Sequence, residues 1–168
     1  MDLFLLRHAI AEPAGQSGAG LDRDRRLTPE GEKKMRKIAR GMKACKLEFD
    51  LILSSPFIRA KQTADIVAEI FRCKKRLKLS PHLAPGGSFQ KLIDELNSDY
   101  ADKKSILLTG HEPYLSSLIS FLISGSPEIP INFKKGGLGK LTAEGLRHGR
   151  CATLEWLLTP RQLQALRE

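Results

Sequence analysis

The chain has few cysteines, few aromatic residues and no long apolar segment. Its three cysteines, Cys45, Cys73 and Cys151, are widely separated and odd in number. Their spacing fits neither a disulfide framework nor a zinc site, so we expect free thiols in a cytoplasmic protein and no metal site built on cysteine. No apolar stretch approaches the roughly 20 residues of a membrane span, and the run at 1–6 is shorter than the roughly 7 residues of a secretory signal.

Acidic residues are also scarce, with 19 Asp and Glu against 28 Lys and Arg and a formal net charge of +9. This excess indicates either an anionic partner (phosphate, nucleic acid or an acidic protein face) or only a solvated basic surface. Aromatic residues make up 6% of the chain and do not alternate with basic ones, and no nucleic-acid-binding motif occurs. These absences argue against nucleic acid. A non-catalytic basic module that binds anions or nucleic acid remains an alternative.

The length and the apolar pattern predict one domain. A chain of 168 residues is long enough to bury a sizeable core, and neither a linker nor a repeat divides it, so we expect residues 1–168 to form a single domain. Continuous apolar runs are typical of strands that are covered on both faces, and an alternating run is typical of a strand nearer an edge. The continuous runs are 3–6, 50–55 and 105–109, and the alternating run is 76–80.

Helix signals lie between these runs. The predicted helices are 27–45, 55–71, 88–97 and 112–125. Thr28 and Pro29 fit the N-cap and first position of the first helix, and Ser55 and Pro56 repeat that plan in the second. Gly125 fits the end of the last one.

The order of these elements predicts an α/β fold. Alternating strands and helices indicate a three-layer sandwich, in which helices cover both faces of a mostly parallel central sheet. The segments 138–145 and 151–158 predict a C-terminal antiparallel hairpin that extends the sheet. The stretch at 12–26 is Gly-rich and charged, and we expect a mobile loop there.

Cationic and imidazole side chains follow three of the predicted strands. Arg7 and His8 come directly after the first run, Arg59 lies one turn into the helix after the second, and His111 follows the third continuous run. Ligands of open α/β sheets bind outside the carboxyl ends of the strands, so these four residues are expected to converge on one rim.

Phosphoryl transfer is the chemistry that needs this set. Guanidinium groups bind phosphoryl oxygens bidentately, and helix N-termini near 56 and 112 add N–H donors. A neutral imidazole is a competent nucleophile near neutral pH. A second imidazole, if protonated, stabilises charge on the equatorial oxygens. Each residue taken alone also fits a helix cap or an exposed ion pair, so spacing leaves both interpretations open.

Four segments of the chain form a recognisable set in this order: LLRHAIAEP, LTPEGEKKMRKIA, ILSSPFIRAKQTADIV and ILLTGHEPYLSSL. In order and spacing they resemble the histidine phosphatase superfamily (phosphoglycerate mutase-like), and most of all its SixA-like phosphohistidine phosphatases. The resemblance implies that His8 is the catalytic nucleophile and becomes phosphorylated. The other catalytic or phosphate-binding positions that it implies are Arg7, Arg59, His111, Ser55 (or Ser54) and Arg26.

The chain departs from the superfamily at an acidic position. The phosphomonoesterases and mutases of the superfamily carry a Glu in an L-x-E segment, where this chain has Leu83, Ala84 and Pro85. Release of an alkoxide calls for a general acid, whereas an imidazole, with a conjugate-acid pKa of roughly 6.5, needs less help to leave. Glu112 and Glu12 are substitutes to consider, although neither stands at the family's position.

The resemblance and the missing acid together imply a protein histidine phosphatase. Its partner would be a phosphohistidine-containing phosphocarrier or phosphotransfer domain, with inorganic phosphate as product and no cofactor. Lys134, Lys135 and the arginines near 25 would dock an acidic face of that partner. A small-molecule phosphomonoesterase of the same superfamily is the alternative.

Overall fold

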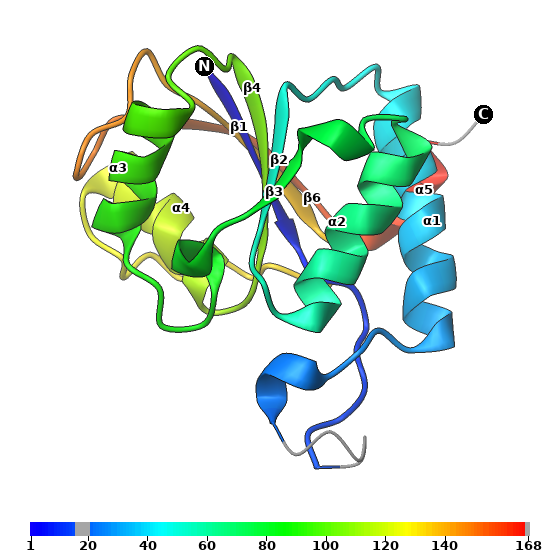
Figure 1. Ribbon diagram of the computed structural model, residues 1–168. Helices are drawn as coiled ribbons and strands as arrows, with labels where there is room; N and C mark the ends of the chain where they lie inside the picture. Colours follow the sequence, from blue (N-terminus) through cyan, green and yellow to red (C-terminus); the bar gives the residue numbers. More distant parts are fainter. Residues whose placement is uncertain (16–20, 167–168) are drawn as a thin grey trace.

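The computed structural model describes residues 1–15 and 21–166, and its centre is a six-stranded mixed sheet (Figure 1). The strands are β1 (Asp2–Arg7), β2 (Leu51–Ser54), β3 (Leu77–Leu79), β4 (Ser105–Gly110), β5 (Leu138–Thr142) and β6 (Thr153–Leu158). Their order is β3-β2-β4-β1-β5-β6. The first four of these are parallel, β5 is antiparallel to β1, and β6 is antiparallel to β5. The predicted α/β class and C-terminal antiparallel hairpin are therefore confirmed.

Helices cover both faces of the sheet. They are α1 (Pro29–Ala44), α2 (Ile58–Ile70), α3 (Phe89–Asp99), α4 (Tyr114–Ser124) and α5 (Pro160–Ala165), with short 3₁₀ turns η1 (Asp22–Asp24), η2 (Lys74–Arg76) and η3 (Pro81–Leu83). In Figure 1, α1, α2 and α5 lie on one side of the sheet and α3 and α4 on the other. In the described part of the chain, no helix is long and apolar enough to cross a membrane.

The two faces of the sheet build two cores. Successive residues of a strand point to opposite faces, so Leu3 and Leu5 pack with α3 and α4 while Phe4 and Leu6 pack with α1, α2 and α5. All four side chains are at most 3% exposed. Because every strand belongs to one sheet between these cores, we propose that the chain forms the single domain that we expected.

The helix caps follow the sequence in part. The Thr28 hydroxyl accepts from the Gly31 N–H at 3.0 Å, and Gly125 ends α4 with a left-handed φ of 90°, both as predicted. The predicted cap at Ser55 and Pro56 is wrong, since α2 begins at Ile58. The Ser55 N–H still pairs with Thr109 O at 2.9 Å, so strand pairing holds Ser55 at the end of β2.

The stretch at 12–26 is described only in part, since 16–20 lie outside the described residues. Ala11 forms an antiparallel bridge with Leu27, and the Glu12 N–H donates to Arg26 O at 2.9 Å. The turn η1 lies between these ends of the stretch. Its mobility remains a prediction.

Candidate active site

The carboxyl end of β1 presents His8. The His8 N–H donates to Gly110 O at 3.0 Å, which extends the parallel pairing of β1 with β4 by one residue. The Ala9 N–H donates to the Thr63 hydroxyl at 3.1 Å, and that hydroxyl donates to Arg59 O at 2.7 Å. Because α2 holds the backbone beside it, the 6% exposed His8 side chain is fixed in place.

The segment that follows His8 is held at Ile10 by α1 and at Leu27 by α2. The Thr28 N–H donates to Ile10 O at 3.0 Å. Gly31 packs so closely on this segment that a Cβ there would clash with the same carbonyl group. The Leu27 N–H donates to the Gln62 side chain at 2.7 Å. The Gln-Thr pair of the S-P-x-x-R-A-x-Q-T segment therefore anchors both ends of the excursion that follows His8.

The hydrogen bond of its ring sets the tautomer of His8. Its Nδ1 lies 2.7 Å from Ala9 O. A carbonyl oxygen only accepts, so Nδ1 carries the hydrogen and Nε2 presents a lone pair. Burial lowers the pKa of His8 to about 4; the Ala9 hydrogen bond opposes this change, and the charges of Arg59, Arg7 and Lys135 reinforce it. At neutral pH the imidazole is therefore uncharged, which is the form that can act as a nucleophile.

Arg59 lies in the first turn of α2 and faces the lone pair of His8. Its Nε is 3.4 Å from His8 Nε2. One terminal nitrogen of the guanidinium donates to Asp22 O at 2.6 Å, and the other donates to the Asp22 carboxylate at 2.9 Å. The guanidinium also lies 5.3 Å from the ring centroid of Phe57. The Arg59 side chain is 5% exposed, so the structure holds a nearly buried cation directly against the histidine.

His111 follows β4 and completes the cluster with Ser55. Its Nε2 lies 2.8 Å from Ser55 Oγ, and its ring centroid lies 5.2 Å from that of His8. Burial, with the charge of Arg59 next, lowers the pKa of His111 to about 3. At neutral pH the second imidazole is therefore uncharged as well. Its Nδ1 is buried without a hydrogen-bond partner among the described residues.

Arg7 contributes charge from the edge of the cluster. One terminal nitrogen donates to Phe133 O at 2.6 Å, and its buried Nε has no partner in the described part of the chain. Burial lowers the pKa of Arg7, and Glu112 offsets part of that effect. The charge of Arg7 in turn lowers the pKa of both His8 and His111, so its guanidinium lies within electrostatic range of both rings.

Among the described residues, no hydrogen bond or ion pair joins the Arg26 side chain to this cluster. Arg26 is exposed, and its carbonyl group pairs with Glu12. Its neighbour Arg25 reaches the Asp22 carboxylate at 2.8 Å and Glu12 O at 2.7 Å. The role of Arg26 at the edge of the pocket remains a prediction. Asp22, the residue that holds Arg59, was missed because a loop without periodicity gives no signal of its long-range contacts.

Glu112 is engaged at a helix terminus. Its carboxylate accepts from the Ser116 N–H at 2.9 Å, in the first turn of α4. A carboxylate in this place complements the positive end of the helix dipole. Within the described ranges, no group of three or more His, Cys, Asp or Glu residues could hold a metal ion.

Comparison with known proteins gives the family. The model of the histidine phosphatase superfamily (branch 1) matches residues 3–84. An uncharacterized protein of Picosynechococcus sp. is 33% identical over 156 residues, which are 89% of this chain and 86% of that protein. The chain belongs to the histidine phosphatase superfamily.

Two further relatives cover almost the whole chain. Phosphohistidine phosphatase SixA of Escherichia coli is 28% identical over 165 residues, which are 98% of this chain and 97% of SixA. The structure of the protein histidine phosphatase SixA complexed with tungstate matches with a TM-score of 0.81 and 28% identity, over 97% of this chain and 99% of that one. Membership of the superfamily and similarity to SixA support a phosphatase with a SixA-like fold.

Proposed function

We propose that this member of the superfamily is a phosphohistidine phosphatase that works through a phosphorylated His8. The observation that carries this proposal is the hydrogen bond from His8 Nδ1 to Ala9 O, which leaves Nε2 unprotonated and facing Arg59. Similarity to SixA, which is a phosphohistidine phosphatase in E. coli, supports the same substrate class here.

The first chemical step is transfer of the phosphoryl group to His8. The lone pair of Nε2 attacks phosphorus, the P–N bond to the substrate's imidazole breaks, and that imidazole leaves with the bonding electrons. It leaves as a neutral ring when its other nitrogen carries a proton. Water then attacks the phosphorus of phospho-His8, which releases inorganic phosphate and returns the imidazole to its starting form.

The cationic and hydroxyl groups around His8 stabilise the transferring group. Arg59 now occupies the space at Nε2, so it must turn its N–H groups onto the phosphoryl oxygens when substrate binds. We assign Arg7 to the same oxygens from the edge of the cluster. Ser55 and His111, joined by a 2.8 Å contact, supply further polar groups, and a bound dianion would favour the protonated form of His111.

The acidic residues near the site indicate which kind of leaving group the substrate carries. The Glu112 carboxylate accepts a hydrogen bond from the Ser116 N–H at the N-terminus of α4, so we assign it to the helix terminus and not to proton transfer. At the position of the family's acid, the chain has Ala84 and Pro85 after η3. A site without a dedicated acid suits a leaving imidazole and not a leaving alkoxide.

We also propose that the protein is cytoplasmic, because its three cysteines are free thiols.

The proposed substrate is a protein phosphorylated on histidine, which would be a phosphocarrier or phosphotransfer domain.

A comparison of leaving groups tests the proposed substrate class. At one fixed pH, kcat/KM is measured for a phosphohistidine protein, phosphoramidate, an aryl phosphate and phosphoserine. We expect the first three to turn over readily and the alkyl ester to be slower by about 100-fold or more, which is the contribution typical of a general acid. Equal efficiencies would show a hidden proton donor and favour the small-molecule phosphomonoesterase. No turnover of any of them would favour the non-catalytic anion-binding module.

A further inference from the structure

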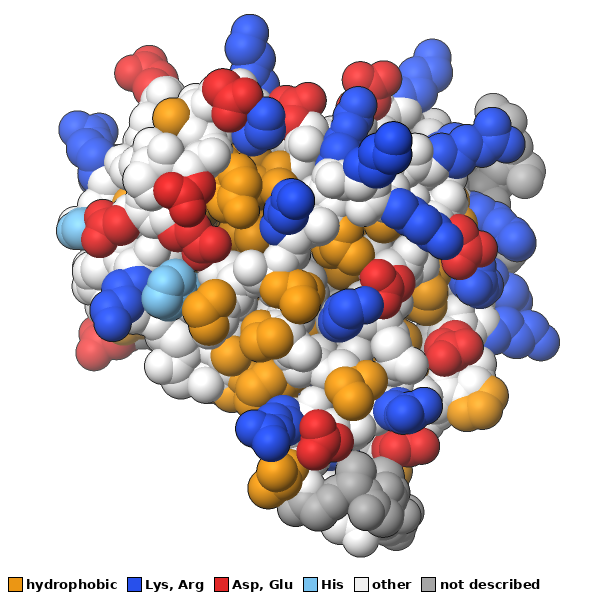
Figure 2. Space-filling model, viewed as in Figure 1, with side chains coloured by type: hydrophobic (Ala, Val, Ile, Leu, Met, Phe, Trp, Pro, Cys, Tyr) orange, Lys and Arg blue, Asp and Glu red, His pale blue; other side chains and the backbone are white. Residues whose placement is uncertain are grey.

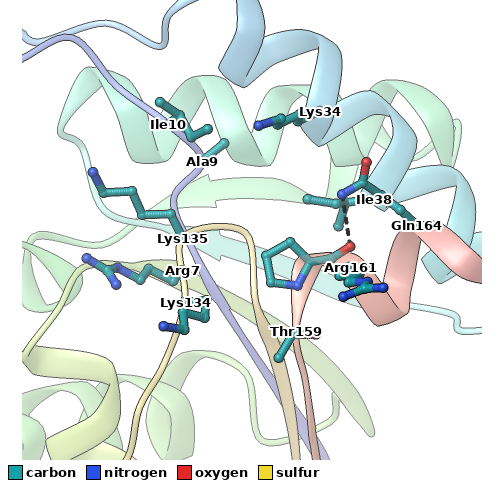
Figure 3. A pocket seen from close by; sticks show the side chains of 11 residues that line it. Arg7, Ala9, Ile10, Lys34, Ile38, Lys134, Lys135, Thr159, Arg161 and Gln164 are labelled. Carbon is teal, nitrogen blue, oxygen red and sulfur yellow. Dashed lines mark hydrogen bonds between the residues drawn. The ribbon is translucent and has the colours of Figure 1, made fainter.

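An open cavity of about 690 Å³ adjoins the active site. Arg7 and Ala9, the two residues that flank His8, form part of its wall. Figure 3 shows that Ile10 follows them and that the rest of the wall comes from α1, from the loop before β5 and from the start of α5. These segments are far apart in the sequence, so the fold assembles the cavity at the carboxyl end of β1.

The rim of the cavity is cationic. Arg7, Lys34, Lys134, Lys135 and Arg161 line it, and among the described residues no Asp or Glu does so. Lys34 forms an ion pair with Glu30 at 2.6 Å. In the part of the chain that the structure describes, Lys134, Lys135 and Arg161 have no acidic partner within 4.0 Å, and all three are exposed. Uncompensated charges of one sign attract a ligand of the opposite sign.

The floor of the cavity is apolar. Ala9 and Ile38 are each 2% exposed and belong to one hydrophobic core. Ile10, next to Ala9 in Figure 3, and Pro160 are half-buried and also line the cavity. A single inorganic anion would leave this floor uncovered. A ligand that fits both parts carries carboxylates at its edge and an apolar centre, which is the composition of an acidic protein surface.

A charge on the rim of the cavity also acts on His8, the proposed nucleophile. Lys135 lies on its rim, and the charge of Lys135 helps to lower the pKa of His8. A phosphohistidine that reaches the 6% exposed His8 would bring its neighbouring residues over the same rim. Figure 2 shows that Lys and Arg side chains are also numerous over the α1 side of the molecule, which adds to the field that an acidic partner would meet.

We propose that this cavity is the docking site for an acidic, partly apolar surface of the protein that carries the phosphohistidine. The proposal deepens the proposed function and rests on it. Lys134 and Arg161 receive carboxylates of the partner beside its phosphohistidine, while the apolar floor receives a hydrophobic side chain. The contact raises the affinity for the protein substrate and leaves the chemistry at His8 unchanged.

The test compares two double charge reversals on two substrates. Lys134→Glu with Arg161→Glu alters the rim. Lys74→Glu with Lys75→Glu makes the same change in net charge at η2, which precedes β3 and so lies at the amino ends of the parallel strands, away from the site. The substrates are a phosphorylated histidine phosphotransfer domain with Asp and Glu beside its phosphohistidine, and phosphoramidate, which has no protein surface.

We expect the rim variant to lose about tenfold or more in kcat/KM on the domain, mainly through KM, because contacts between complementary charges are lost. The kcat/KM of the rim variant on phosphoramidate should stay within about twofold of that of the unaltered protein, and this result would also show that the variant is folded. The η2 variant should have the kcat/KM of the unaltered protein on both substrates. Raising the salt concentration to about 0.5 M should lower the kcat/KM of the unaltered protein on the domain, and it should lower that of the rim variant much less.

Three results would overturn the docking site. In one, the rim variant matches the unaltered protein on the domain, which leaves the proposed function standing. In another, the η2 variant loses as much as the rim variant, so that net charge alone is responsible. In the third, both substrates lose equally on the rim variant. If the unaltered protein hydrolyses phosphoramidate but no phosphohistidine domain, the proposed function fails and the docking site fails with it.

Discussion

Asp22 holds Arg59 through two contacts, of 2.6 Å from its carbonyl oxygen and 2.9 Å from its carboxylate, while Arg59 Nε lies 3.4 Å from His8 Nε2. A carboxylate therefore occupies guanidinium donors to which we assign phosphate binding. The Asp22 side chain is 51% exposed, so solvent screens the pair and a phosphate group can displace it.

Asp22→Asn should therefore strengthen the binding of phosphate. Loss of the competing charge frees the guanidinium, and we expect the inhibition constant for inorganic phosphate to fall by about two- to fivefold, as suits an exposed ion pair. Competitive inhibition of aryl phosphate hydrolysis measures this constant. Asp24→Asn, at the third residue of the same turn, is the matched control. Weaker phosphate binding in Asp22→Asn would mean that the carboxylate positions Arg59 for phosphate instead of competing with it.

Arg59→Lys should impair catalysis although it keeps the positive charge. A lysine ammonium cannot bind two phosphoryl oxygens with a planar pair of donors, and it loses the contact with the Phe57 ring. We expect kcat/KM to fall by about 100-fold or more, as for removal of a donor to a developing oxyanion. Arg36→Lys, at an exposed ion pair with Glu69, controls for the substitution itself. Near-normal kinetics in Arg59→Lys would show that Arg59 does not bind the phosphoryl oxygens.

The two buried histidines should stay neutral well below the usual range of imidazole. Burial penalises the charged form, so protons bind His8 only as the pH falls through about 4, and His111 only near 3. The nitrogen resonances of the imidazole side chains, followed by NMR without phosphate, should show both rings uncharged from pH 7 to 5. On the acid side of its pH profile, kcat/KM should therefore fall because of the enzyme only near pH 4, where His8 gains its proton. A His8 ring that gains its proton between pH 6 and 7 would contradict this arrangement.

Glu112→Gln should leave catalysis nearly intact. The carboxylate stabilises the first turn of α4 and is not assigned a proton-transfer role, so we expect kcat on a phosphohistidine protein to change by less than about threefold and stability by less than about 1 kcal/mol. Thermal unfolding and steady-state kinetics give the two values. Glu128→Gln, on an exposed glutamate, is the control. A large loss of kcat confined to substrates with poor leaving groups would identify Glu112 as the missing acid.

The parts of the fold that follow local periodicity were predictable from the sequence. Continuous apolar runs located β1, β2 and β4, and the residues that follow these strands supplied the candidate active-site cluster of His8, Arg59 and His111. That rule works because parallel strands in register end at one rim: Arg7 pairs with Gly110, and Ser54 pairs with Thr109.

Features that depend on tertiary contacts were not predictable. Ser55 was assigned to a helix cap because Ser-Pro fits one, whereas its N–H pairs with Thr109 O just after β2 and its hydroxyl lies 2.8 Å from His111 Nε2. Asp22 meets Arg59 across 37 positions of sequence, which no local pattern encodes. The apolar floor of the cavity forms only where α1 and α5 pack together.

Trapping of phosphorylated His8 tests the central claim most directly. The protein is mixed with labelled phosphoramidate or phosphohistidine domain, quenched in base within the first turnover, and mapped by mass spectrometry under conditions that preserve phosphohistidine. We predict an acid-labile phosphoryl group on His8 that forms and decays at rates compatible with kcat, and none in His8→Gln, which should also lose turnover. Full turnover by His8→Gln, or a phosphoryl group on any other residue as the kinetic intermediate, would contradict the account.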